Sequence, residues 1–280
     1  MPKQKKMWDN ILTVIMTLLS LLWIYPIVLI LLNSLKIEGS FTTSTVFKLP
    51  TAETFAGLSN YVYGVTKMGF LSSLGYSLVI TVTSVVLILL CCSMTGWYLT
   101  RVNNKLSKFM NLLIVFSMVV PFQMVMFTLS KTADQLNLNT PWNICIIYLG
   151  FGAGLAVFMF TGFMKSVPIE IEEAAMIDGC GDLRYILTIL MPICKPIITT
   201  LFVQSFITIW NAYLWPLIIT ASAPDMRTVM VGITKLNSWE DTNYQLVLAG
   251  VTISLIPSFI LFVIMRRNMA KGGTEGSLVG

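Results

Sequence analysis

Side chains that could do chemistry are sparse in this sequence and gather in one short stretch. Residues 168–182 hold five of the 13 acidic residues. These five are Glu170, Glu172, Glu173, Asp178 and Asp182. The sequence has no histidine, and its five cysteines form no Cys-x-x-Cys pair. Zinc sites of the usual kind and histidine-based acid–base chemistry are therefore excluded, and the cysteines are read as small apolar residues.

The order of residues in this stretch predicts a short helix. Pro168 suits the first helical turn, where a missing N–H costs nothing. The glutamates follow directly, where their charge complements the helix dipole. Gly179 and Gly181 end the helix, and a second helical stretch over about 183–190 leads into Pro192. The helix could rest on lipid headgroups, but an anionic leaflet would repel its glutamates, which favours a protein partner.

The composition requires lipid around most of the chain. Hydrophobic residues make up 56% of the sequence and charged residues 11%, against about 25% charge in soluble domains. The net charge of +5 does not indicate nucleic-acid binding, because basic residues stand singly or in pairs at the ends of apolar runs. Such positions carry orientation signals in membrane proteins.

Six stretches without charge are each long enough for the ~20 apolar residues of a membrane-crossing helix. We expect crossings at about residues 11–32, 70–98, 109–130, 142–163, 196–220 and 245–265, with a cytoplasmic loop at 164–195. The first stretch exceeds the roughly 7–15 apolar residues of a signal peptide, and no small-x-small site follows it. It is predicted to be an uncleaved crossing within one domain, residues 1–280.

The distribution of lysine and arginine sets the expected orientation. With the N-terminus inside, twelve of the 18 Lys and Arg residues lie on the cytoplasmic side. The positive-inside rule favours this arrangement. An even number of crossings then places both termini in the cytoplasm.

The cytoplasmic loop resembles the EAA loop of ABC importer permeases. The loop contains Glu173-Ala174-Ala175, followed after three residues by Gly179. Nine residues further comes Ile189, and one more residue separates it from Met191-Pro192. The family has Leu where this chain has Met191. Further similar segments are Asn33–Lys36, Pro121–Gln123, Leu136–Thr140 and Trp210–Leu217. In the last segment Ala212 stands where the family often has an acidic residue, which puts a polar role at that site in doubt.

This resemblance implies an all-α membrane protein with six transmembrane helices and the type I ABC importer permease fold. Within the family, the chain is similar to the subgroup of the maltose-transporter G subunit. Members of this subgroup lie in the bacterial cell membrane and belong to importers of carbohydrates. Its members pair with a second permease subunit and work with two ATP-binding subunits and an extracytoplasmic solute-binding protein. The residues implied in coupling to the ATPase are Glu173, Ala174, Ala175, Asp178, Gly179, Ile189 and Pro192. Glu173 would supply the docking charge, the alanines close approach, and Gly179 the turn.

Residues that could contact the sugar are predicted from their side-chain types. Sugars bind by stacking on aromatic rings and by hydrogen bonds to uncharged polar groups. Candidates within the crossings are Gln123, Asn143, Gln204, Trp210, Asn211 and Tyr213. Packing is the stronger interpretation for each of them, because aromatic residues also form interfacial belts and amides also join helices.

Two other function classes compete with this interpretation. An ion-coupled carrier or channel would need no ATPase, but such carriers usually place ionisable groups within their crossings. Binding of sodium by backbone carbonyls of broken helices would evade that objection. A membrane-embedded enzyme would need a nucleophile, base or metal cluster. We expect a transport subunit without catalysis, without a bound cofactor, and with ATP on its partners, because no Gly-rich phosphate loop with its Lys is present.

Overall fold

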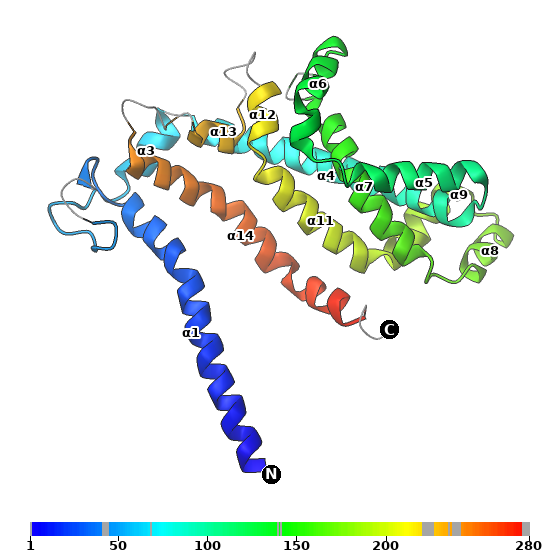
Figure 1. The fold of residues 1–280 in the computed structure, drawn as a ribbon, viewed down its shortest axis with the longest axis horizontal. Helices are drawn as coiled ribbons and strands as arrows, with labels where there is room; N and C mark the ends of the chain where they lie inside the picture. Colours follow the sequence, from blue (N-terminus) through cyan, green and yellow to red (C-terminus); the bar gives the residue numbers. More distant parts are fainter. Residues whose placement is uncertain are drawn as a thin grey trace. The chain divides into compact units, whose positions relative to one another are not determined.

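The computed structural model describes residues 2–40, 45–67, 69–138, 140, 142–219, 227–234, 236 and 242–275, with side chains from residue 8 to 266 except 219. Most of these residues are helical (Figure 1). The chain divides into two compact units. Unit 1 comprises Met1–Leu71 and Gly232–Ile256, and unit 2 comprises Ser72–Val231 and Pro257–Gly280. Among the described residues the only β-pairing is a bridge between Lys36 and Phe55. The prediction of an all-α fold is confirmed.

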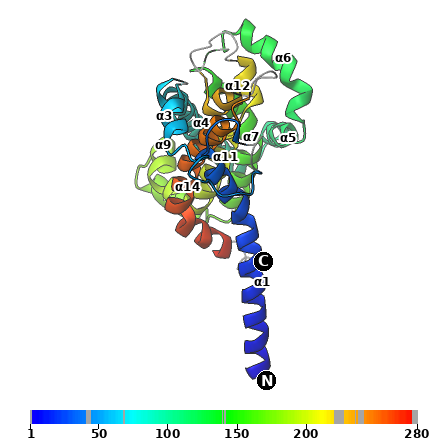
Figure 2. The same cartoon turned by 90° about the vertical axis from the view of Figure 1, so that its left-hand side faces the viewer.

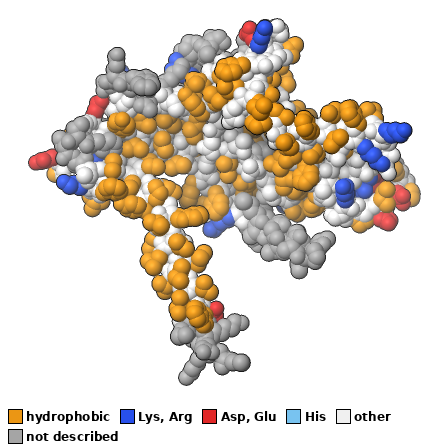
Figure 3. All heavy atoms as spheres, viewed as in Figure 1, with side chains coloured by type: hydrophobic (Ala, Val, Ile, Leu, Met, Phe, Trp, Pro, Cys, Tyr) orange, Lys and Arg blue, Asp and Glu red, His pale blue; other side chains and the backbone are white. Residues whose placement is uncertain are grey.

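Unit 1 begins with α1 (Pro2–Ser34), a single uninterrupted helix in Figures 1 and 2 despite Pro26. Its apolar side chains from Trp8 to Val28 are exposed, and hydrophobic atoms cover it in Figure 3. Its hydroxyl groups bond to carbonyls one turn back, as Thr17 does to the Thr13 oxygen at 2.8 Å. Both features suit a helix whose solvent is lipid.

The end of α1 is fixed by polar contacts to the following loop and to α3 (Ser59–Thr66). The Asn60 amide donates to the carbonyls of Ser34 and Lys36, at 2.8 Å each. Lys36 itself is fully buried and donates to the Thr45 carbonyl at 3.4 Å. Burial lowers the pKa of the Lys36 ammonium group from its ordinary value. Unit 1 also includes α14 (Tyr244–Glu275) as far as Ile256, and there Gln245 donates to the Ser40 hydroxyl at 3.0 Å.

Unit 2 holds most of the helices. They are α4 (Phe70–Arg101), α5 (Lys105–Ser117), α6 (Phe122–Gln135), α7 (Ile144–Met164), α8 (Glu170–Ile177), α9 (Asp182–Tyr185), the π-helical segment η1 (Ile186–Leu190), α10 (Met191–Ile193), α11 (Lys195–Trp210), α12 (Leu214–Ile219) and α13 (Val229–Thr234). Helices α4, α13 and α14 are divided between the two units, because one end of each belongs to unit 1. Helix α7 packs on α5 and α11, and α6 contacts α12. The charged side chains seen on this unit gather mainly around α8 and α9 and at the far end of α6 (Figure 3).

Within the described part of the chain, four helices are long and apolar enough to cross a membrane. They are Trp8–Ser34, Phe70–Arg101, Ile144–Met164 and Tyr244–Arg266, which coincide with four of the expected crossings. By the rise of 1.5 Å per residue, α4 is about 48 Å long. That exceeds the roughly 30 Å hydrocarbon core, so α4 must tilt or extend beyond it.

The other two expected crossings are each interrupted by a non-helical break in the structure. Over 109–130, α5 and α6 meet at 107°, because Pro121 lacks an N–H and disfavours helical backbone before it. Over 196–220, α11 ends at Trp210, residues 211–213 are not helical and α12 follows, while residue 220 lies outside the described residues. The stretch Asp182–Ile193 and α11 also meet at 84°. A count of six crossings requires each bent pair to serve as one crossing.

Close contacts of α7 with α4 and α5 depend on glycine. A Cβ atom at Gly96 of α4 would lie 2.7 Å from the Phe160 Cβ of α7. A Cβ atom at Gly154 of α7 would lie 3.2 Å from the Ile114 carbonyl oxygen of α5. In lipid, where apolar surface gains little by leaving its surroundings, small residues allow the backbone approach that holds helices together.

Replacing Gly96 by Ala tests this packing. The new methyl group has no room against the Phe160 Cβ, so we expect the variant to lose roughly 1–3 kcal/mol of stability, as over-packed cores do. Thermal unfolding of the detergent-purified protein measures the loss.

The matched control is Gly75→Ala on the same helix. Gly75 is exposed, and no other atom lies within 4 Å of the place that its new methyl group would take. Helix propensity then favours alanine by up to about 1 kcal/mol. Equal stability of the two variants would contradict the proposed role of Gly96.

Candidate functional site

Helix α8 ends in a tight glycine turn that the sequence predicted. Gly179 has a φ of +77°, a conformation that side chains disfavour. Its N–H donates to the Met176 carbonyl at 3.0 Å, and the Cys180 N–H donates to the Ala175 carbonyl at 2.9 Å. This pair of bonds is the Schellman motif, which satisfies carbonyls at the helix end. The turn sends the chain into α9.

The two sides of α8 differ in exposure. Glu173, Ala174, Met176 and Ile177 are exposed, and Ile177 reaches 86% exposure. These four residues are called the α8 outer face below. Ala175 is buried at 6% exposure. It therefore packs within the chain, unlike Ala174, and does not lie on the surface where both alanines were expected to allow close approach.

An ion pair fixes the buried side of α8 to the end of α4. The Arg101 Nε donates to the Glu172 carboxylate at 2.8 Å, and the Arg101 Nη2 donates to the Val167 carbonyl at 3.2 Å. The two side chains of the pair are 16% and 7% exposed. The pair was not predicted from the sequence, because no local pattern connects residues 71 positions apart.

The remaining residues predicted for coupling lie after the outer face. Asp178 is exposed and ends α8. Ile189 is half-buried in η1, and Pro192 is exposed in the short α10. The chain then bends by 84° at Cys194, which is fully buried. The seven predicted residues thus lie in one segment, but they do not form one surface.

The structure separates the residues predicted for the substrate path. Trp210 is 1% exposed and stacks on Phe206, with ring centroids 5.7 Å apart, so it serves packing. Asn211 is exposed and donates to the Ile207 carbonyl at 2.9 Å. Gln123 is exposed at the start of α6. The Asn143 amide donates to the Asn137 carbonyl at 2.9 Å.

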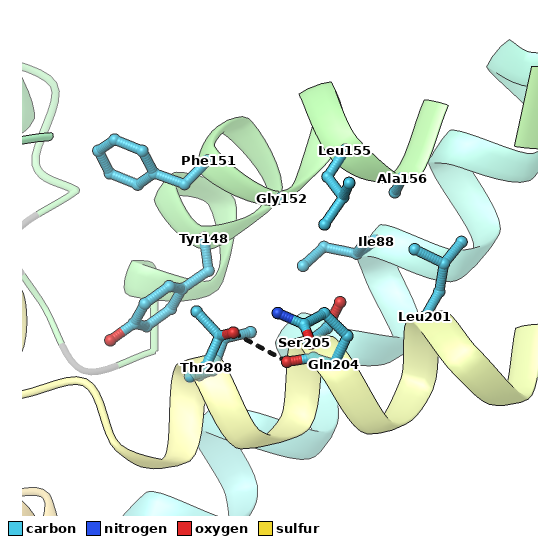
Figure 4. Close-up of a pocket in the computed structure, with 11 residues that line it drawn as sticks. Ile88, Tyr148, Phe151, Gly152, Leu155, Ala156, Leu201, Gln204, Ser205 and Thr208 are labelled. Atoms are coloured by element: carbon cyan, nitrogen blue, oxygen red, sulfur yellow. Dashed lines mark hydrogen bonds between the residues drawn. The ribbon is translucent and has the colours of Figure 1, made fainter. Parts of the chain in front are cut away.

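Gln204 and Tyr213 line two neighbouring hollows of unit 2. The first hollow has a volume of about 200 Å³ and lies between α4, α7 and α11. In Figure 4, Gln204, Ser205 and Thr208 rise from α11 toward Phe151 and Leu155 of α7. The second hollow, of about 300 Å³, is lined by Tyr213. The two share Tyr148, Phe151 and Thr208 as lining residues.

Sequence reasoning identified Tyr213 but missed other aromatic and hydroxyl residues of these hollows. Tyr148 and Phe151 come from the uncharged α7, and Ser205 and Thr208 from α11, where each resembles an ordinary residue of an apolar helix. An edge-to-face cluster of Phe122, Phe151 and Trp215 borders the second hollow, with centroids 5.2–6.2 Å apart. The described residues include no group of three His, Cys, Asp or Glu side chains that could hold a metal ion.

A family model matches residues 88–271 of the chain. The model describes the binding-protein-dependent transport system inner membrane component. The matched range begins within α4 and contains α8, both hollows and most of α14. It confirms the resemblance drawn from the loop pattern.

Relatives and a solved structure agree with this match. The chain is 32% identical to the probable starch degradation products transport system permease protein AmyC of Thermoanaerobacterium thermosulfurigenes, over 96% of each chain. It is 28% identical to the arabinooligosaccharides transport system permease protein AraQ of Halalkalibacterium halodurans, again over 96% of each. Its fold is similar to a chain of a bacterial ABC transporter involved in alginate import, with a TM-score of 0.75, 23% identity, and coverage of 94% of this chain and 97% of that one. The chain therefore belongs to the binding-protein-dependent transport system inner membrane components, with the fold of an ABC importer permease.

Proposed function

We propose that this chain is the membrane-spanning subunit of an ATP-driven importer that brings oligosaccharides into a bacterial cell. Family membership supports the importer, and the sugar cargo is supported by the names of AmyC and AraQ, which refer to starch degradation products and arabinooligosaccharides. The observation that carries the proposal is α8. This short helix exposes an acidic and apolar face and is held to a membrane-crossing helix by a buried ion pair.

The α8 outer face is suited to a protein partner. Ile177 and Met176 expose large apolar side chains at 86% and 51%, beside the Glu173 carboxylate. Apolar side chains that remain exposed on a short helix gain by burial in a groove. A basic group in that groove would pair with Glu173, and Ala174 leaves room for close contact. We assign this face to the ATP-binding subunit of the importer.

Coupling then follows as a shift between two states of the assembly. ATP draws the two ATP-binding subunits together, and α8 moves with the surface on which it docks. The pair between Glu172 and Arg101 passes this movement to the end of α4. ATP favours the outward-open state only by binding that state better than the inward-open one.

The chain itself is proposed to hydrolyse no ATP and to bind no cofactor. Its sequence has no Gly-rich loop followed by Lys that would hold phosphates. Its partners would be a second permease subunit, two ATP-binding subunits and an extracytoplasmic binding protein. The family description, which names binding-protein-dependent transport, supports the last of these.

The proposed orientation places both termini and the loop 164–195 in the cytoplasm, where ATP is available. The excess of Lys and Arg on that side supports it. The turn between α4 and α5 would also be cytoplasmic, whereas the loop after α1 would face outward.

Reversing the charge of Glu173 tests docking. We expect Glu173→Lys to insert normally but to lose most of the co-purifying ATP-binding subunit and most sugar uptake, because a cation would meet the basic groove. Affinity purification of the assembly and uptake by whole cells measure the two effects.

Glu53→Lys is the matched control, since Glu53 is an exposed carboxylate of the loop after α1. It should leave the amount of ATP-binding subunit unchanged. Wild-type recovery of that subunit with Glu173→Lys would remove the docking role.

The ion pair between Arg101 and Glu172 is tested by a double-mutant cycle. Either single alanine variant leaves one partly buried charge without its partner and should uncouple ATP hydrolysis from uptake. We expect a coupling free energy of roughly 1–3 kcal/mol, since the two groups share one contact and retain some exposure. Unfolding of the purified assembly and the ratio of sugar imported to ATP hydrolysed are the readouts. Additive losses in the double variant would show that the pair does not act as a unit.

The orientation is tested by cysteine labelling in a variant without the native cysteines. Thr45 lies in the loop after α1 and Asn103 lies between α4 and α5, and both are exposed. A membrane-impermeant maleimide applied to intact cells should label Thr45→Cys, and should label Asn103→Cys only after permeabilisation. The opposite pattern would reverse the orientation.

A further inference from the structure

The first hollow contains hydrogen-bonding groups that the described part of the chain does not satisfy. The Tyr148 hydroxyl is buried and has no hydrogen-bond partner among the described residues. The Gln204 side chain is exposed and makes no hydrogen bond with any of them. In apolar surroundings an unpaired hydroxyl such as that of Tyr148 is costly. The hydroxyl of Tyr148 and the exposed amide of Gln204 are therefore both available to a partner that enters the hollow.

The exposed side of α11 carries a line of polar residues beside the apolar Ile207, whereas that of α1 is mainly apolar. Thr200, Gln204, Thr208 and Asn211 are exposed and recur at intervals of four, four and three residues. The other three bond to carbonyls of their own helix, as Thr208 does to the Gln204 carbonyl at 2.8 Å. Gln204 is thus the residue of this line whose amide is free to bind something else. Such a side suits a hydrated passage more than hydrocarbon.

The opposite wall of the hollow is aromatic. Phe151 is 43% exposed, and Tyr148 lies where the two hollows meet. An aromatic face with nearby amide and hydroxyl groups matches a sugar ring, whose C–H bonds are apolar and whose hydroxyl groups both donate and accept. Pockets for small ligands commonly combine an apolar lining with a few such polar groups.

The lining also limits the charge of the occupant. None of the residues that line either hollow is Lys, Arg, Asp or Glu. A carboxylate or phosphate bound there would lose its hydration without gaining an opposite charge, which is costly. The hollow therefore favours a neutral sugar over an acidic or phosphorylated one.

We infer that the hollow between α4, α7 and α11 is a subsite for one ring of a neutral oligosaccharide, which Gln204 and Tyr148 bind by hydrogen bonds beside the Phe151 ring. This inference rests on the proposed import of sugars and adds the position and the charge class of the cargo.

The test uses the complete importer in proteoliposomes with its binding protein, and with maltotriose and arabinotriose as probes. Gln204→Leu keeps the size of the side chain but removes the amide, and Tyr148→Phe removes only the hydroxyl. One lost hydrogen bond corresponds to a roughly three- to tenfold change. We expect each variant to raise the KM for the transported probe by that factor and to change the preference between the two probes.

Gln135→Leu is the matched control, because Gln135 is exposed at the end of α6 and lines neither hollow. It should transport both probes like the wild type. Wild-type KM and preference in Gln204→Leu and Tyr148→Phe would overturn the subsite while leaving the proposed function standing. Loss of the partner permease from purified Gln204→Leu would also overturn it, since Gln204 would then join the two permeases. Failure of the wild type to import either probe would overturn both proposals.

Discussion

Backbone hydrogen bonding in hydrocarbon is the constraint on which this structure depends. Lipid offers no partner to an N–H or carbonyl group, so each crossing must satisfy its backbone within its own helix. The same rule acts on side chains of α1, where Thr13, Thr17 and Ser20 each bond to a carbonyl four residues back. Lipid also weakens the drive to bury apolar surface between helices. Contacts then depend on fit, which explains the closeness of α4 and α7 at Gly96.

A charged side chain at the end of α4 makes a specific contact with α8. Arg101 is the last residue of α4, and its partner Glu172 belongs to α8. A buried ion pair is weak evidence of stability, because desolvation of two charges offsets much of their attraction. Its directional bonds have another consequence. The Arg101 guanidinium holds both the Glu172 carboxylate and the Val167 carbonyl, so the segment that leads from α7 into α8 is oriented against α4. A force applied to the outer face of α8 then acts on a helix of the membrane domain.

Sequence patterns predicted the features whose causes are local. The glutamates at the start of α8 and the glycine at its end act within one or two turns, and they were identified correctly. The burial of Ala175 was missed, because it depends on which side of α8 faces α4, and that side is set by Arg101 far away in the chain. Trp210 was named as a candidate for the substrate path with packing as the stronger interpretation, and its stacking on Phe206 agrees with packing. The bend at Pro121 was readable from proline chemistry, yet an uncharged stretch alone predicts a straight crossing.

Under the proposed function, a low content of charge in the two hollows would also select the cargo. Ala212 lines the second hollow at a position where a carboxylate would have given it a negative charge. With alanine there, and with amide and hydroxyl groups in the first hollow, the described lining offers a solute hydrogen bonds without a fixed charge. A neutral sugar exchanges its water for such groups at little cost, whereas an ionised one gives up hydration that the lining cannot replace. If the hollows lie on the sugar path as proposed, the scarcity of charge that allows these helices to cross lipid would also favour passage of uncharged, hydroxyl-rich molecules.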